Sequence, residues 1–134
     1  MHSWDLGSLK LQPRLPEILS SSEDARAIAL ELEAGEGLAE HEVHERAWLF
    51  VVSGEIELAS GGKQRARARA GTLIEFPPRE RHGLTAITAA RLLLLLTPWP
   101  GEGHPGALSL REKLYARRHA SAHRGEQGPP PAAA

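Results

Sequence analysis

Hydrophobic residues recur along this chain in short segments that are separated by glycine- and proline-rich turns. Residues 25–32 alternate small or apolar side chains with polar ones, and a long, largely apolar segment runs from Arg46 to about Leu58. Alternation with a period of two is typical of β-strands, and short continuous apolar runs are typical of strands buried on both faces. No helix-length amphipathic segment occurs before residue 107. The pattern therefore predicts an all-β fold, an antiparallel sandwich or barrel.

Further segments extend this prediction. Residues 60–63 predict a hairpin turn into residues 64–70, where arginine and alanine alternate, so that one face of the strand carries only arginines. We expect that face, with Arg65, Arg67 and Arg69, to be an exposed edge that resists addition of further strands. Residues 71–83 predict another strand and turn. Residues 86–97 include five consecutive leucines and predict a strand buried on both faces.

The two ends of the chain differ from this pattern. Two prolines break any helix near the N-terminus, so we expect an irregular or strand-like segment that packs on the barrel. A capping box at Ser109 and Glu112 predicts a short C-terminal helix, and the proline-rich last ten residues predict disorder. The expected organisation is an N-terminal segment over 1–24, a barrel over 25–100, a loop and helix over 101–124 and a disordered tail over 125–134.

Composition excludes several classes of protein. A chain of 134 residues is the size of one domain with one core. Its formal net charge of −1 lacks the basic excess of a nucleic-acid binder, and the absence of cysteine excludes disulfides, thiolate metal sites and cysteine nucleophiles. No apolar run approaches the ~20 residues that span a bilayer, and the N-terminus lacks the features of a signal peptide. We therefore expect a cytoplasmic protein with neither a nucleic-acid nor a membrane partner.

Candidate chemistry gathers just before the first long apolar strand and after a later one. His41, His44 and Glu45 lie in the first group, and His82 lies in the second. Imidazole nitrogens and carboxylate oxygens are ligands that suit Zn, Fe, Mn, Ni or Cu. The same residues can equally form a polar strand end that pairs with nearby arginines, and the sequence leaves both interpretations open.

The spacing of these residues resembles the two motifs of the cupin family of small double-stranded β-helix (jelly-roll) barrels. In the first motif, a glycine is followed after five residues by His-x-His, then by a glutamate and a closing glycine. The second motif contains a glycine, a proline and a histidine at fixed spacing. The matching residues are Gly35, His41 and Gly54 in the first motif and Gly71, Pro77 and His82 in the second. The resemblance implies an antiparallel jelly-roll barrel, to which the short C-terminal helix is added.

The sequence departs from the family pattern at the metal ligands. Val43 replaces the second histidine of the first motif, Ala47 replaces its glutamate, and Arg79 stands where the second motif has a glycine. Of the four ligands that the resemblance implies, only His41 and His82 remain. Stable sites for first-row metals supply three or four protein ligands, so the departure puts a bound metal in question.

Strand alternation indicates which residues could complete a site. In an extended segment His41 and Glu45 share one face, and His44 lies on the other. Glu45 is then the best-placed replacement carboxylate, and two histidines with one carboxylate form the type of set used by non-haem iron. His44 joins only where a bulge redirects it. A site of His41, His44 and His82 with Glu45 as carboxylate ligand, and a barrel without metal, both stay open.

Three functions are compatible with these residues, and the sequence does not decide whether the protein is an enzyme. The first is a barrel that binds a small molecule in a pocket lined by Glu45, Leu49, Glu75 and Phe76. The second, implied by the resemblance, is a metal-dependent enzyme of the dioxygenase or isomerase type that uses Fe, Mn, Ni or Zn. The third is a regulatory or interaction domain that uses the basic C-terminal segment.

The apolar segment after Arg46 also bears on assembly. Leu49 and Val51 lie on one face of the expected strand, and Trp48, Phe50 and Val52 lie on the other. A small two-layer barrel covers only one of these faces. We therefore expect a homodimer that packs sheet on sheet, with the C-terminal helix as the alternative cover.

Overall fold

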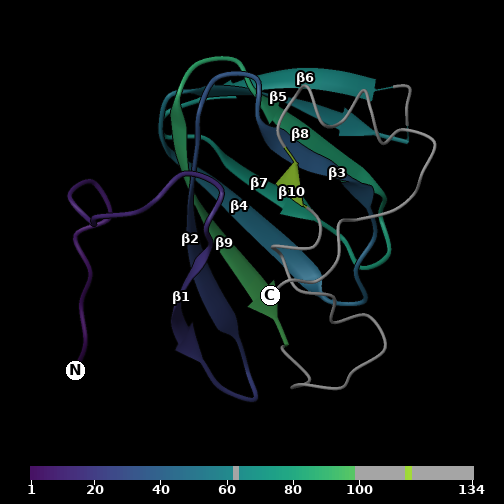
Figure 1. The fold of residues 1–134 in the computed structure, drawn as a ribbon. Coiled ribbons are helices and arrows are strands. Elements are labelled where there is room, and N and C mark those ends of the chain that lie inside the picture. Colours follow the sequence, from purple (N-terminus) through teal and green to yellow (C-terminus); the bar gives the residue numbers. More distant parts are fainter. Residues whose placement is uncertain (62–63, 99–113, 116–134) are drawn as a thin grey trace.

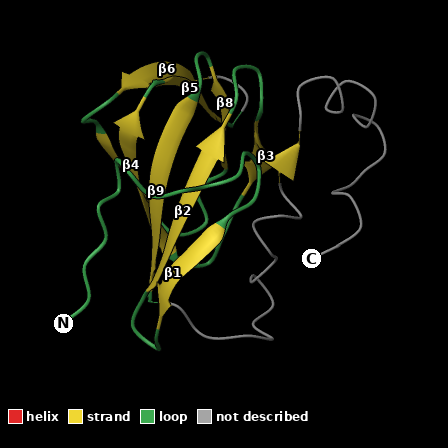
Figure 2. Ribbon diagram, turned by 60° about the vertical axis from the view of Figure 1, so that its left-hand side comes forward, coloured by secondary structure: helices red, strands yellow, loops and turns green. Residues whose placement is uncertain are grey.

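The computed structural model describes residues 1–61, 64–98 and 114–115, and all its regular elements there are strands (Figures 1 and 2). The strands are β1 (Glu17–Ser21), β2 (Arg26–Leu32), β3 (Gly37–His41), β4 (Arg46–Ser53), β5 (Glu55–Ser60), β6 (Gln64–Arg69), β7 (Leu73–Phe76), β8 (His82–Ala86), β9 (Ala90–Thr97) and β10 (Leu114–Tyr115). They form sheet I, in the order β1-β2-β9-β4-β7, and sheet II, in the order β10-β3-β8-β5-β6. Neighbouring strands are antiparallel, which confirms the predicted all-β antiparallel fold. The described residues include no helix long and apolar enough to cross a membrane.

The core lies between the two sheets. Alternate side chains along β4 and β9 point inward, and Leu49, Val51 and Leu92 are at most 1% exposed. Ile56 of sheet II is equally buried on the facing side. Burying each such aliphatic side chain contributes about 1.5–3 kcal/mol. The alternation read from the sequence therefore assigns the inner face of β4 correctly.

Strand boundaries correct two of the predictions. The single strand expected from Arg46 to Leu58 is two strands, β4 and β5, because the chain turns at Gly54. The strand expected over 86–97 begins at Ala90, since Ala86 ends β8 and a turn intervenes. The N-terminal segment contains β1, which pairs with β2.

The predicted C-terminal helix lies almost wholly outside the described residues, as does the predicted disordered tail. The two residues of that helix that are described, Leu114 and Tyr115, form β10 instead. They pair antiparallel with Leu38 and Gly37 of β3. At these two residues the chain pairs with the edge of sheet II instead of forming the helix that the local sequence predicts.

Backbone conformation explains the glycines that match the cupin motifs. Gly35, Gly54 and Gly71 have φ values between +82° and +93°, a region that favours glycine. Gly54 is also closely packed, because a Cβ there would overlap the Ala89 carbonyl oxygen and lie 2.6 Å from the Cα of Ala90. The turn between β4 and β5 therefore requires glycine on two independent grounds.

Arg79 occupies a glycine position of the second motif and keeps its conformation. Its φ is +69°, and its backbone N–H donates to the carbonyl of Val43 at 2.7 Å. A residue with a Cβ in this region costs roughly 1–2 kcal/mol. The hydrogen bond ties the turn after β7 to the connection between β3 and β4, which holds this strained conformation in place.

The arginine face of β6 lies where the sequence places it. β6 is an edge strand of sheet II, and Arg65, Arg67 and Arg69 are exposed, as predicted. Arg65 lies 3.4 Å from Glu57, and Arg67 lies 3.7 Å from Glu55, both on β5. Exposed pairs of this kind contribute between zero and about 1 kcal/mol. Their main effect is to keep this edge and this outer surface polar.

Candidate functional site

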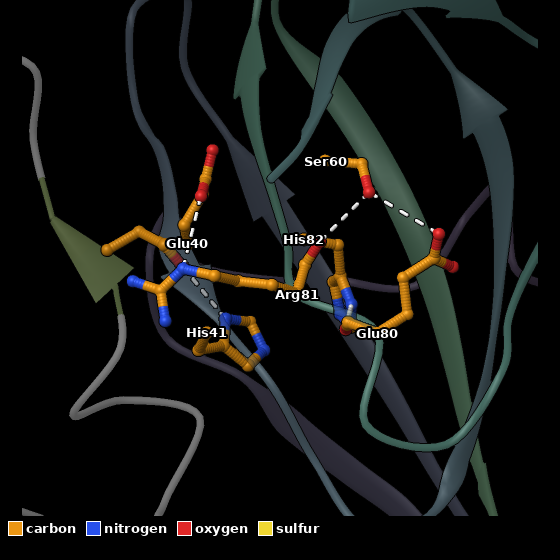
Figure 3. Close-up of polar contacts among 7 residues, drawn as sticks. Glu40, His41, Ser60, Glu80, Arg81 and His82 are labelled. Atoms are coloured by element: carbon orange, nitrogen blue, oxygen red, sulfur yellow. Dashed lines mark hydrogen bonds and ion pairs between the residues drawn. The ribbon is translucent and has the colours of Figure 1, made fainter. Parts of the chain in front are cut away.

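Antiparallel pairing of β3 with β8 brings the two predicted histidines together at one end of the barrel. His41 ends β3, His82 begins β8, and the two are register partners. Their ring centroids are 4.7 Å apart with the ring planes at 60° (Figure 3). His82 is 5% exposed, and His41 is partly exposed. This pair is the centre of the candidate site.

Each of these rings is held by a backbone carbonyl two residues earlier in the chain. Nδ1 of His41 lies 2.7 Å from the carbonyl oxygen of Ala39, and Nδ1 of His82 lies 3.0 Å from that of Glu80. A carbonyl oxygen only accepts hydrogen bonds, so Nδ1 is the donor in both rings. In the neutral form of each ring, Nε2 is then the acceptor nitrogen, and the tautomer is fixed by the fold.

Phe76 packs against the imidazole ring of His82. This residue ends β7 of sheet I and stacks on the imidazole, with centroids 3.9 Å apart and planes within 9° of parallel. Phe76 is 6% exposed. His82 therefore contacts an aromatic ring from each sheet, Phe76 from sheet I and His41 from sheet II, which restricts its movement.

The segment that joins β3 to β4 keeps the alternation expected from the sequence. Val43 and Glu45 are buried, at 4% and 3% exposure, and His44 between them is exposed. Both carboxylate oxygens of Glu45 are inaccessible to solvent. Glu45 thus lies on the buried side of the segment with Val43, and the predicted ligand His44 lies on the opposite, solvent side.

The predicted pocket residues divide between the two faces of sheet I. Leu49 fills the core, and Phe76 contacts His82, as described above. Glu75 does not face the interior, because it is the register partner of Trp48 on the outer side of the sheet. There it is exposed and accepts a hydrogen bond from Arg46 at 2.5 Å. Side chains alternate between the two faces along β7, so Phe76 faces inward and Glu75 faces outward. The prediction of Glu75 as a pocket residue is therefore wrong.

Sequence reasoning missed Ser60 and Glu80, two polar residues beside the histidine pair. Ser60, at the end of β5, is the register partner of His82 on the side away from His41. Its hydroxyl donates to the carbonyl of Arg81 at 3.1 Å and to a carboxylate oxygen of Glu80 at 3.4 Å (Figure 3). Arg81 in turn lies 3.3 Å from Glu40. The sequence predicts Ser60 in a hairpin turn, and only the register of β5 against β8 shows that it lies beside His82.

These residues do not form a complete metal-ligand set. Within residues 1–61, 64–98 and 114–115, no three His, Cys, Asp or Glu side chains are grouped so that they could hold a metal ion. The two positions where the family resemblance expects further ligands, Val43 and Ala47, are apolar and at most 4% exposed. Two imidazoles alone fall short of the three or four ligands of stable sites.

Comparisons with solved structures show the same fold. An RmlC-like cupin protein from Desulfovibrio desulfuricans is 23% identical with a TM-score of 0.67, over 73% of this chain and 97% of that one. An RmlC-like cupin from Methanocaldococcus jannaschii, described as a double-stranded β-helix, is 18% identical with a TM-score of 0.62, over 69% and 89%. A conserved protein of unknown function from Streptococcus pyogenes is 23% identical with a TM-score of 0.59, over 65% and 75%.

No curated protein sequence matches the chain. The sequence model of the cupin domain matches residues 29–97, which is just over half of the chain and runs from within β2 to the end of β9. The glycines at the motif positions with positive φ, Gly35, Gly54 and Gly71, are here called the glycine frame. The sequence match, the antiparallel β-barrel and this glycine frame agree with one another. The chain belongs to the cupin family.

Proposed function

We propose that this cupin binds a small molecule at the barrel end formed by His41, His82 and Phe76, without a resident metal ion. The observation that carries the proposal is the cross-strand histidine pair, in which both Nδ1 atoms are committed to backbone carbonyls. Polar groups with fixed orientation beside an aromatic ring are the usual composition of a ligand site. These groups lie at the end of the barrel, and small barrels bind ligands in that region.

The fixed tautomer indicates the class of ligand. Nε2 of each neutral ring is a hydrogen-bond acceptor, so the pair favours a ligand that presents hydroxyl or N–H donors. The rings are 4.7 Å apart, a separation that suits two donors on one small molecule. A polyhydroxylated compound such as a sugar or polyol meets both conditions and can also pack its carbon face on an aromatic ring.

A metal-dependent enzyme of the dioxygenase or isomerase type is the second candidate. It is favoured by the same Nδ1 hydrogen bonds, because bonds of this kind orient imidazoles that ligate metals through Nε2. Fe, Mn, Ni and Zn are the metals that such nitrogen and carboxylate ligands suit. The apolar residues Val43 and Ala47 weigh against it, since they leave the set of donors short.

A thermal-shift panel of sugars, polyols and small amines tests the proposed site. We expect at least one compound to raise the melting temperature of the wild-type protein and of His44→Ala, but not of His41→Ala. His44 is the matched control, because it is the same residue type three positions away and is exposed. Equal responses of the two variants to every stabilising compound would place ligand binding elsewhere.

A further inference from the structure

We propose that Arg79 binds an anionic group of the ligand, so that the histidine pair takes a polyol that carries a carboxylate or a phosphate. This role for Arg79 rests on the proposed ligand site at His41 and His82, and it adds the residue that selects among the ligands of that site. Arg79 is distinguished by a strained backbone, an exposed side chain and a place beside the two histidines.

The backbone of Arg79 occupies a turn position that favours glycine. The N–H of Glu80 donates to the carbonyl of Pro77 at 3.1 Å and closes a four-residue turn with Pro78 and Arg79 at its centre. A proline at the second position and a φ of +69° at the third are features of a type II turn, whose third residue is usually glycine. A side chain at the third position therefore costs stability, and strain of this kind concentrates at functional sites.

Arg14 is the other non-glycine residue with positive φ among those described, and its side chain has a structural role. Its φ is +64°, and its Nε lies 2.8 Å from a carboxylate oxygen of Glu36, whose side chain is only 10% exposed. Arg79 differs, because it is exposed and its guanidinium forms no ion pair within the part of the chain that the structure describes. An ion pair of the fold offsets the strain at Arg14, whereas the guanidinium of Arg79 is accessible to a solute.

The backbone of Arg79 is tied to both segments that carry the histidines. Its N–H donates at 2.7 Å to the carbonyl of Val43, two residues after His41. The residue that follows it, Glu80, presents the carbonyl that holds Nδ1 of His82 at 3.0 Å. Arg79 therefore lies at the same end of the barrel as the histidine pair. A long arginine side chain there can reach an anionic group on a ligand that is seated on the pair.

Two nearby carboxylates are already engaged by other side chains. Glu80 accepts a hydrogen bond at 3.4 Å from Ser60 of β5, whereas His41 lies on β3, on the other side of β8 (Figure 3). Glu40 lies 3.3 Å from Arg81 in an ion pair. The first carboxylate is thus directed away from His41 and the second is neutralised, so the exposed guanidinium of Arg79 is the group that meets an incoming anion.

The guanidinium and the imidazoles together define the class of ligand. A guanidinium is always charged in proteins and presents a fork of N–H donors that matches carboxylate and phosphate oxygens. The Nε2 atoms of the neutral histidine pair accept hydrogen bonds from hydroxyl groups. A polyol with an anionic group at one end, such as a sugar acid or a sugar phosphate, satisfies both requirements.

Isothermal titration calorimetry with sorbitol, gluconate and sorbitol phosphate tests this role. The three compounds share one carbon chain and differ in carrying no charge, a carboxylate or a phosphate, so the tighter anion identifies the group. We expect one of the two anions to bind wild type at least about tenfold more tightly than sorbitol, since hydrogen bonds to charged groups are the stronger ones. Arg79→Gln keeps the Cβ and the strained backbone but has no charge, and it should lose this preference.

Arg79→Gly supplies a second readout that a structural arginine would not give. Removal of the Cβ relieves the strain, so this variant should melt at a higher temperature than wild type without ligand and yet lose the preference for the anion. Arg81→Gln is the matched control, because Arg81 is also an exposed arginine, two residues further along, but is paired with Glu40. It should keep the preference.

Failure of this role and failure of the proposed ligand site give different results. Equal affinities of wild type for sorbitol and both anions, with binding that is lost in His41→Ala, would overturn the role of Arg79 and leave the polyol site in place. A preference that survives in Arg79→Gln, or that Arg81→Gln loses equally, also overturns that role. Anion binding that His41→Ala leaves unchanged would place the anion outside the histidine site and contradict both proposals.

Discussion

The glycine frame and the ligand positions of the cupin motifs differ in what this chain has kept. At the frame, Gly54 has the positive φ and close packing that exclude other residues, and Arg79 adopts the glycine conformation even with a side chain. At the ligand positions, Val43 and Ala47 are core residues. The frame is required by the backbone of the barrel, whereas the ligands are required only by a metal. A chain can therefore keep the fold after losing the metal site.

Gly54→Ala should have the largest effect on the frame. The added Cβ overlaps the Ala89 carbonyl in addition to the conformational strain, and we expect unfolding free energy to fall by roughly 4 kcal/mol in urea titrations. Gly71→Ala is the control, since its φ is +93° but nothing lies within 4 Å of its Cβ. It should lose only about 1–2 kcal/mol. Equal losses in the two variants would show that packing at Gly54 is not decisive.

Introducing the family's ligand residues at positions 43 and 47 tests the statement that the metal ligands, and not the frame, are absent from this chain. In the double variant Val43→His/Ala47→Glu, two polar groups enter the core, and we expect the metal-free protein to lose roughly 3 kcal/mol. Because the frame is intact, added Zn²⁺ should raise its melting temperature and bind at least tenfold more tightly than to wild type. Calorimetric titration of both proteins measures this. Equal affinities would indicate that the barrel end no longer has the geometry of the family site.

Arg79→Gly should produce a smaller change of opposite sign. Removing the Cβ relieves the strain at φ +69°, partly offset by the greater entropy of glycine in the unfolded chain, so we expect a gain of about 1 kcal/mol. Arg81→Gly, two residues further along, lacks this benefit because Arg81 is not among the residues with positive φ. A loss of stability in Arg79→Gly would mean that the arginine side chain is itself required.

His41→Ala should change stability least. The residue is partly exposed and contributes one cross-strand pair, worth about 0.2–1 kcal/mol. Its loss should abolish ligand binding while unfolding free energy stays within about 1 kcal/mol of wild type, as denaturant titration measures. A loss as large as that of Gly54→Ala would make His41 a residue of the frame rather than of the site.

Much of the fold and part of the site follow from local sequence. Period-two alternation places Glu45 on the buried side and His44 outside, and motif spacing identifies the frame glycines and the two histidines. The remainder depends on register between strands that are distant in sequence. Ser60 lies beside His82 only because β5 pairs with β8, and the pairing of β7 with β4 decides that Phe76 rather than its neighbour Glu75 takes the inward position. A shift of one residue reverses every side chain of a strand, and local sequence patterns do not reveal which distant strand pairs with which, or in what register.

Metal content is the most direct test of whether the site works without a metal. Untagged wild-type protein, His41→Ala and His82→Ala would be incubated with Fe, Mn, Ni and Zn, dialysed, and measured by elemental analysis. We predict far less than one metal ion per chain, with no difference among the three proteins. Nearly one ion per wild-type chain, lost in both variants, would contradict a metal-free site and establish the metal-dependent alternative.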